Sequence, residues 1–146
     1  MSDSSVENRG IDEVLFTTLV SISNNMPSFK TFRISTLYLD HGKAGMEMEV
    51  GSEYTNHQGT AHGGLVGTLL DTAIGIAAWT LNSNVLTLEM NLNYIAPLKI
   101  GETAKAEGWV IHAGRINIVT EGEIRNQQNK LIAKSRITYF RIGSFI

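Results

Sequence analysis

A long apolar segment, residues 65–79, constrains the fold of this chain more than any other feature. Almost every residue in it is apolar or small, and Asp71 is the only charged one. A helix that is apolar on nearly every side has to be covered on nearly every side. An ionised carboxylate inside such a helix is costly unless it has a partner or a chemical role. The segment therefore predicts a buried helix whose single carboxylate serves a specific purpose.

The residues on either side of this segment predict one more helix and six strands. Apolar residues between Ile11 and Ile22 follow the spacing of an amphipathic helix, which should end near Asn25, ahead of Pro27. Alternation of apolar and polar residues between turn sequences predicts strands at residues 32–39, 44–53, 86–94, 103–112, 115–125 and 130–141. The predicted order is helix, two strands, buried helix and four strands.

The short turns between these strands favour antiparallel pairing. We therefore expect an α+β fold in which a curved antiparallel sheet wraps around the one long buried helix, plus the N-terminal helix. Such a sheet leaves part of the buried helix open, so a second subunit can cover it.

Size and charge indicate a single domain, residues 1–146, and exclude several classes of function. The net charge is −2, so nothing favours nucleic acid or a membrane surface as a partner. The chain has no cysteine, which excludes disulfides and thiolate chemistry, and its histidines lack zinc-site spacing. The polar N-terminus is not a signal peptide, and the apolar segment is too short to span a membrane. We expect a cytoplasmic protein without a metal site.

A glycine-rich run, Gly59-Thr60-Ala61-His62-Gly63-Gly64, leads directly into the buried helix. Glycine lets the backbone approach a ligand closely, and the N–H groups at a helix start favour negative charge. The N–H groups of Gly63 and Gly64 can therefore hold the oxyanion that forms when a carbonyl is attacked. The alternatives are a plain tight turn for the glycines and a structural hydrogen bond for Asp71.

Two motifs in the chain carry a family resemblance. The first is Asn56-x2-Gly59-x2-His62-Gly63-Gly64, followed by Leu69 and Asp71, and the second is Met90-Asn91-Leu92-Asn93-Tyr94-x2-Pro97-x3-Gly101. Together they resemble the signature of hotdog-fold acyl-CoA thioesterases, especially the PaaI-like and thioesterase superfamily member 2-like enzymes. The likeness extends over residues 51–140. It implies a hotdog fold and hydrolysis of an acyl- or aryl-acyl-CoA, with coenzyme A as part of the substrate and no separate cofactor.

The resemblance also assigns catalytic roles to single residues. It implies that the Gly63 N–H is the main oxyanion donor. Asp71 is then the general base that activates water, or the nucleophile that forms an acyl anhydride. Thr87 occupies the position at which relatives carry a serine or threonine that positions the attacking water. The alternative is that Thr87 is an ordinary strand threonine without a catalytic role. Asn56 can donate its amide to the carbonyl or orient the water, and a turn-forming asparagine is the alternative.

The substrate-binding predictions concern His62, Gly64 and Arg115. We expect the His62 side chain to fix the glycine loop by bonding backbone groups, rather than to transfer protons. Coenzyme A carries phosphates that need cations, and Arg115, directly after Gly114, is the first candidate. Further candidates on late strands are Lys134, Arg136 and Arg141, and for each of them a solvated surface charge is the alternative.

Helix geometry separates Asp71 from the glycine loop of its own chain. Gly64 and Asp71 lie seven positions apart, roughly 10 Å along a helix. Groups that act on one carbonyl must lie within about 3–4 Å of it. Small residues that would let another backbone approach share the helix face with Asp71: Gly64, Gly67, Thr68, Gly75 and Ala78. We therefore expect a homodimer whose sites combine Gly63 of one chain with Asp71 of the other. The resemblance implies the same, with pairs of dimers as homotetramers.

Two other functions compete with thioester hydrolysis. The first is a non-catalytic acyl-CoA-binding hotdog protein, which would not need Asp71. The second is a hotdog dehydratase, whose histidine and acid signature this sequence lacks.

Overall fold

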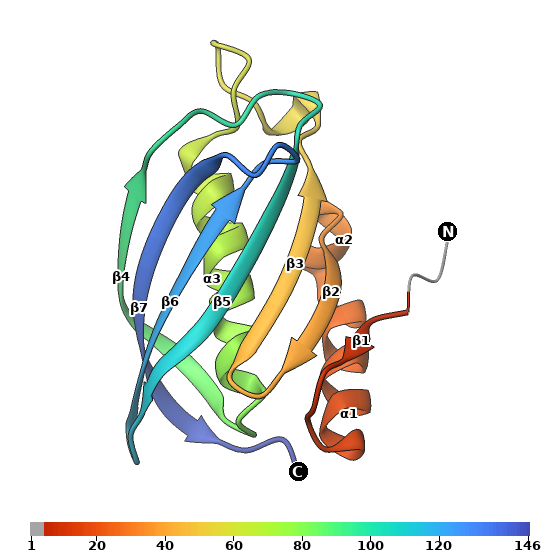
Figure 1. Ribbon diagram of the computed structural model, residues 1–146, viewed down its shortest axis with the longest axis vertical. Coiled ribbons are helices and arrows are strands. Elements are labelled where there is room, and N and C mark those ends of the chain that lie inside the picture. Colours follow the sequence, from red (N-terminus) through yellow and green to blue (C-terminus); the bar gives the residue numbers. More distant parts are fainter. Residues whose placement is uncertain (1–4) are drawn as a thin grey trace.

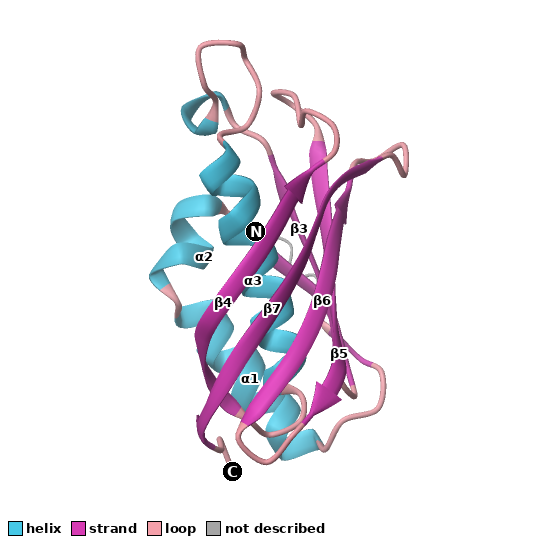
Figure 2. Cartoon of the chain, turned by 90° about the vertical axis from the view of Figure 1, so that its left-hand side faces the viewer, coloured by secondary structure: helices cyan, strands magenta, loops and turns pink. Residues whose placement is uncertain are grey.

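The computed structural model describes residues 5–146 as two layers, a curved sheet with helices on one of its faces (Figure 2). The helices are α1 (Glu13–Asn25), α2 (Pro27–Phe32) and α3 (Gly63–Trp79), with a 3-10 turn at Ser52–Tyr54. The strands are β1 (Glu7–Asn8), β2 (Ser35–Asp40), β3 (Lys43–Glu49), β4 (Asn84–Tyr94), β5 (Thr103–Ala113), β6 (Asn117–Arg125) and β7 (Leu131–Gly143). The predicted α+β architecture is confirmed.

Within residues 5–146 the strands form one sheet in the order β1-β2-β3-β5-β6-β7-β4 (Figure 1). Neighbouring strands are antiparallel, except for the short parallel pair β1 and β2. The chain runs from β3, in the interior of the sheet, through α3 to β4 at the edge of the sheet. The helix α3 therefore crosses the face of β5, β6 and β7. In the described part of the chain, β4 pairs with β7 alone, and its other edge is free.

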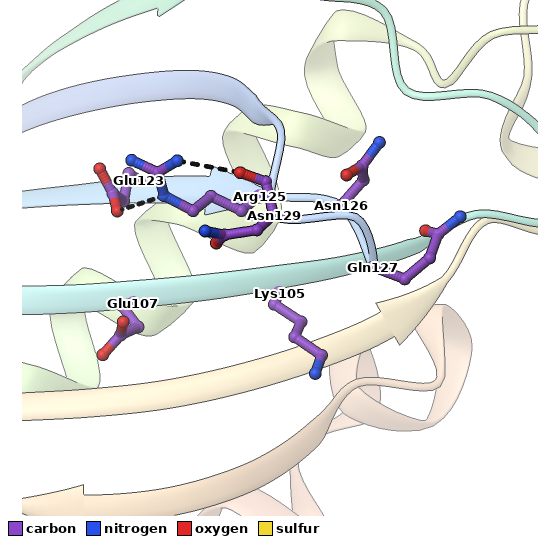
Figure 3. A pocket seen from close by; sticks show the side chains of 7 residues that line it. All are labelled: Lys105, Glu107, Glu123, Arg125, Asn126, Gln127 and Asn129. Atoms are coloured by element: carbon purple, nitrogen blue, oxygen red, sulfur yellow. Dashed lines mark hydrogen bonds and ion pairs between the residues drawn. The ribbon is translucent and has the colours of Figure 1, made fainter.

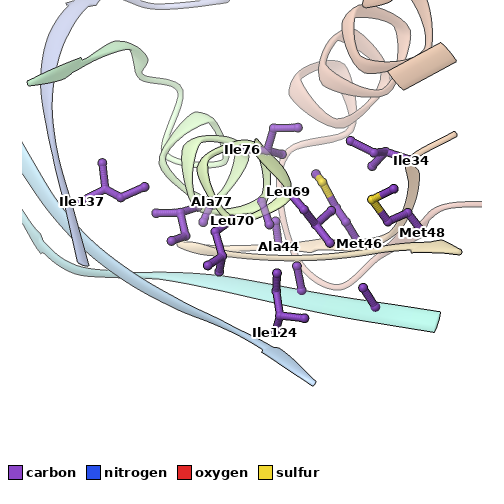
Figure 4. Close-up of a cluster of buried hydrophobic side chains, with 14 of the residues drawn as sticks. Ile34, Ala44, Met46, Met48, Leu69, Leu70, Ile76, Ala77, Ile124 and Ile137 are labelled. Carbon is purple, nitrogen blue, oxygen red and sulfur yellow. The ribbon is translucent and has the colours of Figure 1, made fainter. Parts of the chain in front are cut away.

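The hydrophobic core lies between α3 and the inner face of the sheet (Figure 4). Ten of the 17 residues of α3 are buried, which agrees with a helix that has to be covered on most sides. Strand side chains such as Met46, Ile124 and Ile137 pack in the same cluster. No helix in residues 5–146 has both the length and the apolar character needed to cross a membrane.

Two glycines allow α3 to lie unusually close to the sheet. Gly108 on β5 and Gly122 on β6 are directly opposite in register. A Cβ atom on Gly108 would lie 2.5 Å from the Cα of Ile74 and 2.8 Å from the carbonyl oxygen of Ala73. A Cβ atom on Gly122 would lie 2.5 Å from the Ile74 side chain. The backbone of α3 therefore occupies the space that a side chain at position 108 would fill, and the Ile74 side chain occupies the space at position 122.

We expect Gly108→Ala to lower the free energy of unfolding by about 2 kcal/mol, because over-packing a rigid core strains its neighbours. Gly143→Ala, on β7, is the matched control, since nothing lies within 4 Å of its added Cβ. Chemical denaturation of both variants measures the difference. An unchanged denaturation midpoint for Gly108→Ala would contradict this close packing.

The N-terminal region departs from the sequence prediction. Pro27 starts α2, a position that suits its fixed φ, and Arg33 ends the helix in a left-handed conformation. The strand predicted from residue 32 consequently begins at Ser35. The two-residue strand β1 was not predicted.

Two further strand boundaries were wrong. The strand predicted at 44–53 ends at Glu49, because the chain leaves the sheet and forms the 3-10 turn. The strand predicted from residue 115 begins at Asn117, because Gly114 donates its N–H to the Asn117 carbonyl at 2.8 Å and closes a hairpin turn.

Candidate active site

Two hydroxyl groups meet at one carboxylate oxygen of Asp71, a half-buried residue in the middle of α3. Thr87 on β4 and Tyr139 on β7 are directly opposite in register, so their side chains share the inner face of the sheet. The Thr87 hydroxyl donates to Asp71 Oδ1 at 3.2 Å. The Tyr139 hydroxyl lies 3.1 Å from the same oxygen and 3.1 Å from the Asp71 carbonyl oxygen. The structure therefore brings the predicted residues Asp71 and Thr87 together.

Tyr139 is a candidate functional residue that the sequence analysis missed. Its side chain is only 2% exposed. Burial raises the pKa of the Tyr139 hydroxyl well above its usual range, and the negative charge and hydrogen bond of Asp71 raise it further. The hydroxyl is therefore a neutral donor. Alternation along β7 places Tyr139 inward beside Ile137, but that pattern does not distinguish it from an ordinary core tyrosine.

The start of α3 offers two N–H groups without a hydrogen-bond acceptor. The first helical hydrogen bonds come from Leu65 and Val66, whose N–H groups donate to the His62 carbonyl. No described residue accepts a hydrogen bond from the N–H of Gly63 or Gly64, as is typical of a helix start. A Cβ atom on Gly64 would meet nothing within 4 Å. These two groups are suitably placed to donate to an anionic oxygen.

Tyr94 lies over the Gly63 end of the helix and was not predicted to do so. Its hydroxyl donates to the Gly63 carbonyl at 2.8 Å, and a Cβ atom on Gly63 would lie 2.9 Å from that hydroxyl oxygen. Glycine at position 63 therefore makes room for the tyrosine ring.

The loop before α3 is folded around the side-chain oxygen of Asn56. This oxygen accepts hydrogen bonds from the N–H of Gln58 at 2.9 Å, and from the N–H and hydroxyl of Thr60 at 3.3 and 3.2 Å. Gly59 completes the loop with a φ of +74°. The alternative interpretation of Asn56 as a turn-forming residue thus accounts for the hydrogen bonds of its side-chain oxygen. Its amide nitrogen has no acceptor among the described residues and can still donate a hydrogen bond to a substrate.

His62 holds the loop differently from the prediction. Its N–H donates to the Tyr54 carbonyl at 2.9 Å, and its carbonyl accepts the first helical bonds. The imidazole is exposed and makes no hydrogen bond to the residues that the structure describes. The backbone of His62, and not its side chain, therefore fixes the start of α3.

Within one chain the two glycine N–H groups and the Asp71 carboxylate stay apart, because seven positions of regular helix span roughly 10 Å. The helix face of small residues is also less open than predicted. Gly75 and Ala78 are buried by their own chain, and a Cβ atom on Gly75 would lie 3.3 Å from the Tyr139 hydroxyl oxygen. Only the N-terminal half of this face can receive another backbone.

Arg115 lies in the exposed turn between β5 and β6. It makes no ion pair with any described residue. The other candidate cations already have partners: Lys134 with Glu123, Arg136 with Glu121, and Arg141 with the Gly114 carbonyl. Arg115 is therefore the candidate whose charge is most available to a phosphate.

Two cavities of the described chain lie away from these residues. One of about 180 Å³ is lined by charged and amide side chains of β5, β6 and the β6–β7 turn, on the side of the sheet opposite α3 (Figure 3). Another of about 570 Å³ lies between Arg33, Glu49 and Glu53. Neither contains Asp71 or Gly63, and their polar linings do not suit an acyl chain. Residues 5–146 also contain no cluster of three acidic or histidine side chains that could hold a metal ion.

Comparison with known proteins identifies the family. The sequence profile of the Thioesterase superfamily matches residues 58–133, more than half of the chain, and this stretch includes Gly63, Asp71 and Thr87. The chain belongs to this superfamily. Acyl-coenzyme A thioesterase 13 of Homo sapiens is 35% identical over 100 residues, which cover 66% of this chain and 71% of that protein. Acyl-coenzyme A thioesterase PaaI of Escherichia coli is 31% identical over 117 residues, which cover 80% and 84%.

Solved structures show the same relationship. The E. coli PaaI protein superposes with a TM-score of 0.88 at 27% identity, covering 94% of this chain and 99% of that one. A Streptococcus mutans protein bound to acetyl CoA superposes with a TM-score of 0.75 at 28% identity, covering 77% and 91%. The predicted hotdog fold, the PaaI-like family and the thioester hydrolase class are therefore confirmed. The roles of the individual site residues stay predictions.

Proposed function

We propose that this protein is an acyl-CoA thioesterase, which hydrolyses an acyl- or aryl-acyl-CoA to a free acid and coenzyme A. The observation that carries the proposal is the Asp71 carboxylate, which Thr87 and Tyr139 hold by Oδ1 while Oδ2 has no partner among the described residues. The names of the human and E. coli relatives and the acetyl CoA bound to the S. mutans protein support the substrate class.

In the proposed reaction, the Gly63 N–H, with Gly64 beside it, donates to the thioester carbonyl oxygen and stabilises the oxyanion that forms. Asp71 from the other chain either takes a proton from the attacking water or attacks the carbonyl carbon itself. In the second case, water then hydrolyses the acyl anhydride. The carbon–sulfur bond breaks, and the leaving thiolate takes up a proton to give free coenzyme A.

Four further residues complete the proposed site. The Thr87 hydroxyl donates its only proton to Asp71, so the lone pairs of the hydroxyl oxygen can accept a hydrogen bond from the attacking water. Asn56 offers its amide nitrogen to the carbonyl or the water. The exposed His62 lies beside Gly63 and lines the approach of the substrate, while Arg115 binds the phosphates of coenzyme A.

The free edge of β4 supports a site shared between two chains. Within residues 5–146 this strand of 11 residues is unpaired along one side, and Leu86 and Leu88 on it are each 58% exposed. Such an edge is a template for pairing with a second strand. A two-fold axis beside β4 would set two α3 helices next to each other, with Gly63 of one facing Asp71 of the other. We propose this homodimer, and a homotetramer built from two of them.

Release of free thiol from a panel of short, medium, long and aryl acyl-CoA substrates tests the proposal. We expect one class to be hydrolysed at rates typical of enzymes, on the order of 1 s⁻¹ or more. Binding without thiol release from any of them would contradict it and favour a non-catalytic acyl-CoA-binding protein. Conversion of a hydroxyacyl-CoA with its thioester intact would favour a dehydratase.

A further inference from the structure

The hydroxyl of Tyr139 contacts the carboxylate of Asp71, and this tyrosine has no assigned role in the proposed reaction. It lies 3.1 Å from Asp71 Oδ1, and 68 positions separate the two residues in the sequence. The carboxylate is the stronger of its two acceptors, because hydrogen bonds to an ionised group are shorter and stronger than those to a neutral carbonyl. The neutral Tyr139 hydroxyl therefore directs its proton mainly to Oδ1.

The surroundings of this hydroxyl are shaped to keep it in place. Tyr139 is buried in β7, and Gly75, one turn after Asp71 on α3, leaves room for its oxygen. The charged residue on the same face of β7 as Tyr139 is Arg141, and its guanidinium donates to the Gly114 carbonyl. α3 contributes no charge besides Asp71, and Glu89 on β4 points to the opposite face of the sheet. Tyr139 and Thr87 are thus the groups that act directly on the carboxylate.

We propose that Tyr139 is a positioning residue that, with Thr87, fixes the Asp71 carboxylate by Oδ1 and leaves Oδ2 as the reacting oxygen. This inference rests on the proposed thioesterase function. Two donors on one oxygen restrict rotation of the carboxylate, so Oδ2 keeps a single direction toward the substrate.

A purely structural tyrosine is the competing explanation, because a buried hydroxyl needs some partner in any fold. Loss of a purely structural hydrogen bond would lower stability and leave kcat and KM of the folded enzyme unchanged. Loss of a positioning group would lower kcat with little change in KM.

Tyr139→Phe tests the inference, with Tyr38→Phe as its matched control. Tyr38 is also buried and also donates its hydroxyl to a carboxylate, that of Glu107, but it lies on β2 and away from β4 and β7. We expect Tyr139→Phe to lower kcat about 10-fold or more, with little change in KM. For Tyr38→Phe, we expect kcat and KM to stay at wild-type values.

A carbon-13 NMR spectrum at one fixed pH keeps this test independent of the proposed activity. The Asp71 carboxyl signal is assigned by its loss in Asp71→Asn, and its chemical shift should change in Tyr139→Phe but not in Tyr38→Phe, because Tyr139→Phe removes a hydrogen bond from the carboxylate. Gly75→Ala, which keeps the hydroxyl but crowds it, should give a smaller change. If the wild type hydrolyses no acyl-CoA and the signal still shifts in Tyr139→Phe, the function is wrong and the contact of Tyr139 with Asp71 stands. An unchanged signal and an unchanged kcat in Tyr139→Phe would overturn the inference.

Discussion

Asp71→Asn should reduce thiol release about 100-fold or more, the usual contribution of a positioned base, with a larger loss if the carboxylate is the nucleophile. The amide oxygen of asparagine can still accept hydrogen bonds from Thr87 and Tyr139, so we expect the fold to persist. The amide nitrogen that replaces Oδ2, however, can neither take a proton from water nor form an anhydride. Steady-state assays on the best acyl-CoA, with circular dichroism to monitor folding, measure the effect.

Glu89→Gln is the matched control for this substitution. It also replaces a carboxylate by an amide, on the same strand as Thr87, but Glu89 is exposed on the other face of the sheet. We expect its activity to stay within about twofold of wild type, as for most surface substitutions. Wild-type rates in Asp71→Asn would exclude the mechanism with Asp71 as base or nucleophile.

Two inactive variants should restore activity when they are combined in one dimer. Gly63→Pro removes the proposed oxyanion donor at the first helical position, where proline is well tolerated. The preceding residue, His62, has φ −55° and ψ 139°, which suits a residue before proline. In a hybrid of Gly63→Pro with Asp71→Asn, one of the two shared sites has an intact Gly63 and an intact Asp71. The other site lacks both.

We therefore expect the hybrid dimer to have about half of the wild-type activity, although each parent alone is inactive. The hybrid is obtained by co-expression with two different tags and purification on both. Gly63→Ala is the control for Gly63→Pro, since it adds the same Cβ next to Tyr94 but keeps the N–H. Its activity should exceed that of the proline variant by about 100-fold, the usual effect of one oxyanion donor. A hybrid as inactive as its parents would show that the two residues do not form one site across chains.

The helix and its carboxylate could be predicted because they depend on local composition. Residues 65–79 are so apolar that burial follows from the hydrophobic effect alone, and α3 is the most buried helix of the structure. The separation of Asp71 from the glycine N–H groups likewise follows from the rise of a helix. Proline is a common first residue of a helix, but the prediction treated Pro27 only as a residue that ends α1. The start of α2 at Pro27 was therefore missed.

The contacts between strands could not be predicted in the same way. Tyr139 reaches Asp71 because β7 pairs with β4 in one particular register, and the register shifts between Thr87 and Glu89. A shift of one residue would turn Tyr139 to the outer face, and alternation along one strand does not reveal which register its partner adopts. The same limit applies to Gly108 and Gly122, whose importance depends on the backbone of α3 lying against Gly108 and the Ile74 side chain lying against Gly122.

The sequence by itself determined the buried helix, its single carboxylate, the glycine N–H groups at its start and the separation between these groups and that carboxylate. Each of these follows from the order of neighbouring residues and the fixed geometry of a helix. Only the tertiary structure decided that Thr87 and Tyr139 hold the same oxygen of Asp71, that backbone atoms of His62 fix the loop, and that one edge of β4 is free of pairing within residues 5–146. These depend on pairings between distant segments, which are selected by the packing of the whole core.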